Sequence, residues 1–241
     1  HNTPNAILSG LVGSEMCIRD SPGDEIIIPA PYWVSYPDIV KLSDGTPVIV
    51  LCDQSNDFKI TADQLRESIT NKTRWLILNS PGNPTGAVYS SDELSALAKV
   101  IRIFPNLSVI CDDIYESIIY DDNKFATLAE VAPDLKKRVL TVNGVSKSHA
   151  MTGWRIGYAG GPIDLIEAMT KLQGQSTTNA SSVSQSAALA ALNGSKQTLR
   201  NFNKAYTRRM NIVYDELKKI PGLSLKKPQG ACYHFINCTE F

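Results

Sequence analysis

The chain has 241 residues, 43% of them apolar, which is enough to bury the core of one or two domains. Its 24 basic and 24 acidic residues give a formal net charge of zero, which argues against a nucleic-acid partner or an anionic membrane surface. No apolar run reaches the length of a membrane span or a signal peptide, so we expect a cytoplasmic protein. Five cysteines without CxxC spacing and three scattered histidines favour free thiols and no metal site.

Strand and helix patterns alternate from Pro22 onward. In chain order we expect a strand at 25–29, a helix at 34–42, a strand at 47–51, a helix that Thr61 caps and that runs to about 69, a strand at 74–79, and a helix from a Ser90–Glu93 capping box to about 103. There follow strands at 107–111, 138–142 and 156–159, helices at 163–172, 179–192 and 197–219, and strands at 224–226 and 232–236. The alternation predicts an α/β fold with three αβα layers around a mostly parallel sheet.

The same pattern suggests how the chain is divided. We expect residues 22–194 to form one large domain and residues 195–241 to begin a smaller α+β domain. The helix at 179–192 is rich in small residues, which suits a buried or subunit-facing helix. Residues 11–20 closely resemble the translated read-through of a transposon-based sequencing adapter, so we expect residues 1–21 to be non-native. An ordinary amphipathic turn of helix is the alternative for this segment.

Polar groups follow three of the predicted strands, where open α/β sheets bind ligands. Asn83 follows the strand at 74–79 in a turn whose Pro and Gly residues have an ordinary conformational explanation. Asp112 follows the strand at 107–111, and a carboxylate there is costly unless it meets a cation, whereas Asp113 can equally serve as a helix N-cap. Lys147 and Arg155 follow the strand at 138–142.

Lysines are mostly solvated surface residues, so Lys147 gains meaning only from its neighbours. An amine can form an imine with a carbonyl, and a guanidinium grips phosphate at two points. With Tyr115 the set contains a carboxylate, a phenol, an amide, an amine and a guanidinium. A pyridine aldehyde phosphate requires such groups to protonate its ring nitrogen, bind its ring oxygen, hold its aldehyde and move protons.

From Pro22 onward the sequence resembles the class I aminotransferases, which are pyridoxal 5′-phosphate (PLP) enzymes of fold type I. It is most similar to the bacterial-type aspartate aminotransferase subgroup. The matching stretches occur in the family's order and spacing, and they are residues 22–25, 31–37, 83–86, 112–116, 143–158, 175–178 and 230–233. Any one of them alone is weak evidence, but the ordered set is specific.

The resemblance implies a role for each candidate residue. Lys147 would be the Schiff-base lysine and would shuttle protons, Asp112 would pair with the pyridinium nitrogen, and Tyr115 and Asn83 would bind the ring hydroxyl. Arg155 would bind the phosphate. The implied reaction transfers an amino group from an L-amino acid, with aspartate as the first choice, to a 2-oxo acid, and the whole protein would be a homodimer.

Trp33 would stack on the cofactor ring, although an ordinary core aromatic explains it equally well. Aromatic amino acids, alanine and prephenate remain open as substrates.

Three parts of the family pattern are not found in this sequence. They are the phosphate-binding turn ahead of the Pro-Gly-Asp-Glu motif, the N-terminal arm with the tyrosine lent to the partner subunit's phosphate, and the C-terminal arginine that binds the substrate carboxylate. We therefore expect a fragment with weak activity or none. PLP-dependent C–S lyases and aminocyclopropane-carboxylate synthase-like enzymes share the cofactor residues and stay as alternatives, as does a regulatory protein that keeps the fold without the chemistry. A Rossmann dinucleotide binder is disfavoured because no GxGxxG follows a strand.

Overall fold

The computed structural model describes residues 7–8 and 23–240. The strands are β1 (Ile7–Leu8), β2 (Glu25–Ala30), β3 (Thr46–Leu51), β4 (Thr73–Asn79), β5 (Ser108–Asp112), β6 (Val139–Gly144), β7 (Gly157–Gly160), β8 (Ser224–Leu225) and β9 (Ile236–Asn237). The α-helices are α2 (Tyr36–Leu42), α3 (Ala62–Ser68), α4 (Ser91–Ile103), α5 (Leu128–Val131), α6 (Val145–Ser148), α7 (Ile163–Ser176), α8 (Ser182–Asn193) and α9 (Lys196–Leu217).

The main sheet has seven strands in the order β1-β7-β6-β5-β4-β2-β3. Strands β2 to β6 run parallel to their neighbours, and β7 is antiparallel to both β6 and β1. The prediction of a mostly parallel sheet is confirmed. The adapter-like segment at residues 11–20 lies outside the described residues, whereas β1, from the same expected non-native part, pairs with β7.

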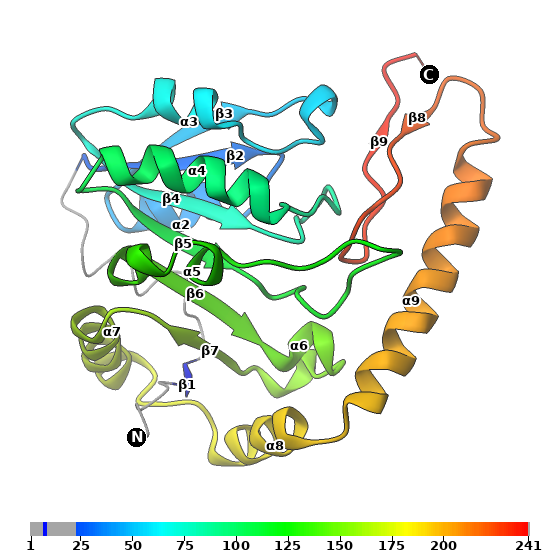
Figure 1. Cartoon of the computed structure of the whole chain (residues 1–241). Helices are drawn as coiled ribbons and strands as arrows, with labels where there is room; N and C mark the ends of the chain where they lie inside the picture. The colour runs from blue at the N-terminus through cyan, green and yellow to red at the C-terminus, as the bar shows by residue number, and fades with distance from the viewer. Residues whose placement is uncertain (1–6, 9–22, 241) are drawn as a thin grey trace.

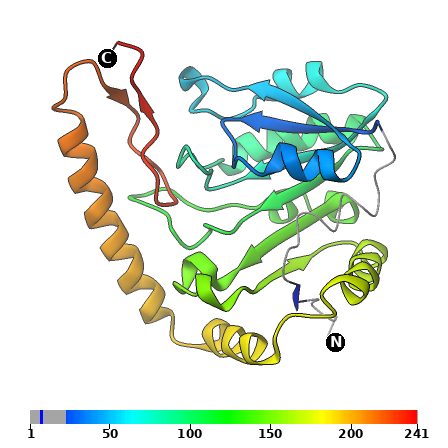
Figure 2. The same cartoon turned by 180° about the vertical axis from the view of Figure 1, so that it is seen from behind.

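Alternating side chains of the strands build two apolar layers, one on each face of the sheet. Ile27, Leu76 and Val109 belong to the core that includes residues of α3, α4 and α5. Ile26, Ile77 and Ile110 belong to the opposite core with residues of α2 and α7. Figure 1 shows α4 in front of the sheet and Figure 2 shows α2 on the opposite face. Because neighbouring residues of a strand point to opposite faces, this pattern produces the predicted three αβα layers.

Two helices begin with the expected caps. In the capping box of α4, Ser90 accepts the Glu93 backbone N–H and Glu93 accepts the Ser90 backbone N–H. Thr61 and Gln64 form the same arrangement at the start of α3. Such reciprocal bonds satisfy amides that the helix leaves unpaired, and they fix where each helix begins. The capping prediction is confirmed at both positions.

The last part of the chain stands at one side of the sheet. Figure 1 shows α9 and the β8–β9 hairpin on the side to which the parallel strands point. Met210 of α9 is buried in a cluster with Tyr115, Ile118 and Tyr120. The predicted boundary near residue 194 falls in the turn between α8 and α9, and the division into two domains stays a prediction.

The strand predicted at 232–236 is wrong, because only Ile236 and Asn237 pair with β8. The preceding backbone is already bonded to the large sheet's loops. The amides of Gln229 and Gly230 each donate to the carbonyl of Gly86 at 2.9 Å, and the Ala231 amide donates to the Ile118 carbonyl at 3.0 Å. This close approach requires glycine, since a Cβ on Gly230 would lie 2.7 Å from the Ile118 oxygen.

Candidate active site

The parallel strands β4 and β5 end at polar residues that their register aligns, and the adjacent β6 runs two residues further. Asn79 on β4 pairs with Asp112 on β5, which pairs with Val142 on β6. The Asn79 side-chain amide donates to the Asp112 carbonyl at 2.8 Å, and its Oδ1 accepts the Asn83 backbone N–H at 2.7 Å. Asn79 therefore ties the Asn83 turn to the end of β5. The Asn83 turn therefore lies beside the end of the strand that carries Asp112.

The carboxyl group of Asp112 is partly buried and has two hydrogen-bond donors. The Tyr36 hydroxyl donates to Oδ2 at 2.7 Å, and the Ile114 backbone N–H donates to Oδ1 at 3.3 Å. Burial raises the pKa of Asp112, while these two donors and the charge of Lys147 oppose that rise. The neighbouring Asp113 is more deeply buried, and this burial raises its pKa to about 8.

Lys147 lies in α6, a single helical turn that follows β6 directly, where the sequence suggested a loop. Its side chain is half-buried, and Nζ lies 5.7 Å from the centre of the Tyr115 ring. Burial raises the pKa of both Asp112 and Cys232, and the positive charge of Lys147 partly offsets that rise in each. An amine, a carboxylate and a phenol thus meet at the carboxyl edge of the sheet, although they come from two different strands.

Tyr115 is buried, and its hydroxyl lies 2.5 Å from the hydroxyl of Tyr233. The two rings meet edge to face with their centres 5.7 Å apart. Burial is the largest cause of a raised pKa for Tyr115, followed by its contact with Tyr233. The Tyr115 phenol therefore keeps its proton at neutral pH and can act as a hydrogen-bond donor.

The other two predicted residues lie at the margin of this group. Trp33 is 38% exposed, and its ring meets the Tyr36 ring edge to face at a centre distance of 5.4 Å. Arg155 is exposed with a positive φ of 50°, and its Nη1 donates to the Thr152 carbonyl at 2.9 Å. Among the described residues, the side-chain hydrogen bond of Arg155 goes to Thr152 rather than to Lys147 or Asp112. The roles of Trp33 and Arg155 remain predictions.

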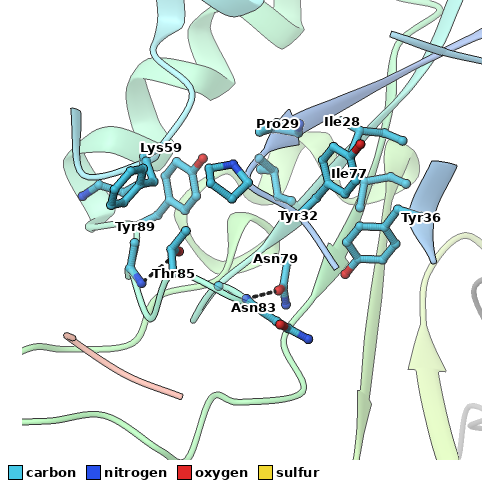
Figure 3. Close-up of a pocket in the computed structure, with 15 residues that line it drawn as sticks. Ile28, Pro29, Tyr32, Tyr36, Lys59, Ile77, Asn79, Asn83, Thr85 and Tyr89 are labelled. Carbon is cyan, nitrogen blue, oxygen red and sulfur yellow. Dashed lines mark hydrogen bonds between the residues drawn. The ribbon is translucent and has the colours of Figure 1, made fainter. Parts of the chain in front are cut away.

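A small cavity of about 30 Å³ lies beside this edge. Figure 3 shows Tyr36, Asn79 and Asn83 along it, with their polar ends directed toward the same side. Lys59 also lines the cavity, but its Nζ is 2.6 Å from Glu93 Oε1 and donates to the Val88 carbonyl at 3.2 Å. A buried ammonium group whose partners are a carboxylate and a backbone carbonyl has a structural role, so we do not assign Lys59 to catalysis or cofactor binding.

Sequence reasoning missed three residues of this site. Tyr36 lies within the recognised 31–37 stretch, and Tyr233 within the 230–233 stretch, so the motifs contained both without revealing their partners. In the sequence pattern, Asn79 is only the last residue of a predicted strand. Strand register, rather than any local pattern, brings it to Asp112.

The chain was compared with known protein families. The family described as aminotransferase class I and II matches residues 6–240. The chain belongs to the class I and II aminotransferases. This family implies PLP as the cofactor, and the donor set at the edge of the sheet suits it. Asp112 offers an anion, Tyr115 a donor and Lys147 an amine.

Several named aminotransferases are similar over most of the chain. A protein of Rickettsia typhi named as a probable aspartate/prephenate aminotransferase is 53% identical over 218 residues, which are 90% of this chain and 55% of the relative. An aspartate aminotransferase of Rhizobium meliloti is 50% identical over 90% of this chain and 53% of its own length. The chain therefore spans about half the length of the curated relatives it matches.

Solved aminotransferase structures have the same fold. The crystal structure of the aspartate aminotransferase from Rhizobium meliloti superposes with a TM-score of 0.95 at 46% identity, covering 97% of this chain and 59% of that one. An aromatic aminotransferase from Pyrococcus horikoshii superposes with a TM-score of 0.91 at 37% identity. Within the described part of the aminotransferase chain, no helix is long and apolar enough to cross a membrane.

Proposed function

We propose that the protein is a PLP-dependent aminotransferase that moves an amino group between an L-amino acid, with aspartate first, and a 2-oxo acid. The observation that carries this proposal is the convergence of Lys147, Asp112 and Tyr115 at the carboxyl edge of the sheet. The similar proteins named as aspartate or aspartate/prephenate aminotransferases support aspartate as the substrate.

In this proposal, different residues of the chain would bind different parts of the cofactor. Lys147 would hold the aldehyde, Asp112 the ring nitrogen, and Tyr115 with Asn83 the ring oxygen. When bound, PLP supplies an electron sink for the charge that develops at the amino acid's Cα. Burial raises the pKa of Asp112, and its two hydrogen-bond donors and the charge of Lys147 oppose that rise in favour of the carboxylate. An anion beside the ring nitrogen would favour a protonated ring. Tyr115 can serve because its phenol keeps its proton.

Lys147 would also move the proton in this scheme. Its Nζ lies 5.7 Å from the centre of the Tyr115 ring and its charge acts on Asp112. Its position on a single turn after β6 keeps it at the edge of the sheet. As the free amine, Nζ would accept the proton from the substrate's Cα. Arg155 would bind the phosphate by turning its exposed guanidinium from the Thr152 carbonyl, and Trp33 would cover the ring face.

We also infer that the whole protein forms a homodimer through a surface that includes α8. Leu189 and Leu192, three residues apart on one face of this helix, are exposed apolar side chains, and exposed apolar surface is typical of interfaces. Light scattering on the purified protein tests this assignment. A cytoplasmic location is consistent with the free thiols of the four described cysteines, Cys52, Cys111, Cys232 and Cys238.

The proposal is tested by adding PLP to the 241-residue chain and following the visible absorbance band of a lysine-bound cofactor. We expect a saturable band in the wild type, none in Lys147→Ala, and an unchanged band in Lys171→Ala, which removes an exposed lysine from α7. A band that survives in Lys147→Ala, or no band in the wild type, would overturn the assignment.

Turnover distinguishes the reaction from its alternatives. With aspartate and 2-oxoglutarate we expect slow formation of oxaloacetate or none, because Arg155, the candidate phosphate ligand, is exposed and already bonded to Thr152. Rapid turnover would contradict this expectation of weak activity. Faster release of products from a cysteine conjugate or S-adenosylmethionine would instead support a lyase or a cyclising enzyme.

A further inference from the structure

Tyr36 is the first residue of α2, and its side chain is 2% exposed. Its ring belongs to the apolar core between the sheet and the layer of α2 and α7. A phenol hydroxyl buried in such surroundings is costly unless it finds a partner. Here the hydroxyl donates to Asp112 Oδ2 at 2.7 Å, across a separation of 76 residues. The bond therefore joins the start of α2 to the end of β5.

The direction of this hydrogen bond is fixed by the surroundings of Tyr36. Burial raises the pKa of Tyr36 well above its usual value, and the negative charge of Asp112 raises it further. The phenol thus stays protonated, and the carboxylate is the acceptor. On Asp112 the other donor, the Ile114 amide, bonds the opposite oxygen at the longer distance of 3.3 Å. The bond from Tyr36 is therefore the shorter of the two hydrogen bonds that orient the Asp112 carboxyl group and favour its ionised form.

We propose that Tyr36 is a positioning residue, which holds the Asp112 carboxylate ionised and oriented toward a protonated ring nitrogen. This inference rests on the proposed function, in which Asp112 binds that nitrogen. A second contact points the same way, because the Tyr36 ring also packs edge-on against Trp33, the residue predicted to cover the cofactor ring. One buried phenol thus contacts two of the side chains assigned to the cofactor.

The test begins in the protein without cofactor, by following the ¹³C resonance of the Asp112 carboxyl through a pH titration. Tyr36→Phe keeps the ring that fills the core but removes the donor, so Asp112 should titrate at higher pH than in the wild type. Tyr32→Phe is the matched control, since Tyr32 comes from the same segment, packs against the same core and contributes no interaction to Asp112. An unchanged Asp112 titration in Tyr36→Phe would overturn the inference.

The other titratable groups that interact with Asp112 are Cys111, Asp113, Tyr115 and Lys147. These groups are identical in the wild type, Tyr36→Phe and Tyr32→Phe. A difference in the Asp112 titration midpoint between the proteins therefore reports the effect of the Tyr36 hydroxyl. A measurement on the wild type alone is independent of how the variants fold. The ring ¹³Cζ resonance of Tyr36 should shift with the same midpoint as the Asp112 carboxyl, and a Tyr36 resonance that does not respond would contradict the bond.

A second readout connects the bond to the cofactor. The affinity for PLP should fall roughly tenfold in Tyr36→Phe, the size expected for losing one hydrogen bond to a charged group, and should be unchanged in Tyr32→Phe. Equal affinities in Tyr36→Phe and the wild type would overturn the positioning role. A wild-type chain that binds no PLP would overturn the proposed function instead, while the Asp112 titration still decides the role of Tyr36.

Discussion

The hydroxyls of Tyr115 and Tyr233 lie 2.5 Å apart, although 118 residues separate them in the chain. Tyr115 belongs to the segment after β5, and Tyr233 comes from the segment that leads from β8 to β9. The backbone just before Tyr233 is bonded to the turn at Gly86 and to Ile118, which keeps the two phenols together. The last part of the chain therefore contributes directly to the candidate site.

We predict that Tyr233→Phe weakens PLP binding roughly fivefold. Tyr115 then loses a hydroxyl partner that helps to orient its own O–H, and one such hydrogen bond is worth about 1 kcal/mol. The measurement is a PLP titration by absorbance, with Tyr214→Phe as the control. Tyr214 packs in the same cluster and is not bonded to Tyr115, so its variant should match the wild type. Equal loss in both variants would indicate a general weakening of the cluster.

Arg155→Ala should reduce the affinity for PLP by about tenfold or more and leave the affinity for pyridoxal, which lacks the phosphate, unchanged. The reason is that a phosphate ligand contributes only when the phosphate is present. The comparison of the two ligands separates this role from structural damage, which would weaken both. Arg208→Ala removes an exposed arginine on α9 and should change neither affinity. If Arg155→Ala weakens both ligands equally, Arg155 is not the phosphate ligand.

The strands of the sheet could be predicted from the sequence because buried parallel strands are short, continuous apolar runs. β4 was expected at 74–79 and spans Thr73–Asn79. Two kinds of element could not be predicted from the sequence. The four-residue helix α5 and the 3₁₀ segment Pro133–Arg138 are too short to show a helical period. The last strand was misplaced because the backbone of Gln229, Gly230 and Ala231 bonds to distant loops, and these bonds, which no local pattern encodes, set the course of the chain ahead of Ile236.

In the candidate site, too, some residues could be predicted from the sequence and others could not. Lys147 and Asp112 could be predicted because each follows an apolar strand, and the ends of parallel strands share one edge. Tyr36 could not, since a tyrosine at the start of a helix has the pattern of any core aromatic. Its partner Asp112 is 76 residues away, and only the packing of α2 on the sheet brings the two together.

Asp113 should make the protein less stable as the pH rises. Its folded pKa of about 8 lies above its usual value of 3.8, so the folded state keeps a proton that the unfolded chain loses. Stability from this group is therefore full below about pH 4 and lost as the pH rises to about 8. Between pH 5.5 and 8.5 the loss should be on the order of 3 kcal/mol, at about 1.4 kcal/mol for each pH unit.

Urea denaturation of the wild type and Asp113→Asn at the two pH values checks this prediction. Asparagine has the shape of the protonated carboxyl group and does not ionise, so the variant should be more stable than the wild type at pH 5.5, where the unfolded wild type is already ionised, and by a wider margin at pH 8.5. Asp112 and Glu116, whose pKa values are also raised by burial, contribute to both proteins and cancel in the comparison. Parallel loss of stability in the two proteins would show that Asp113 ionises normally.

Arg138→Ala should destabilise the fold by about 2 kcal/mol. Its Nη1 donates to the carbonyls of Ile101, Phe104 and Leu107 at 3.1, 2.7 and 3.0 Å, so it closes the end of α4 against β6. Removing the guanidinium leaves these carbonyls without their charged donor. Urea denaturation measures the loss, and Lys136→Ala, which removes an exposed neighbour, should cost less than about 0.5 kcal/mol.

The site of covalent attachment tests the central claim most directly. The chain is mixed with PLP, reduced with borohydride to fix any bond between amine and aldehyde, digested and examined by mass spectrometry. Our account predicts that the cofactor's mass is found on the peptide that contains Lys147, and that Lys147→Ala carries none. Attachment to Lys59 or to exposed lysines in place of Lys147, or no attachment at all, would contradict it.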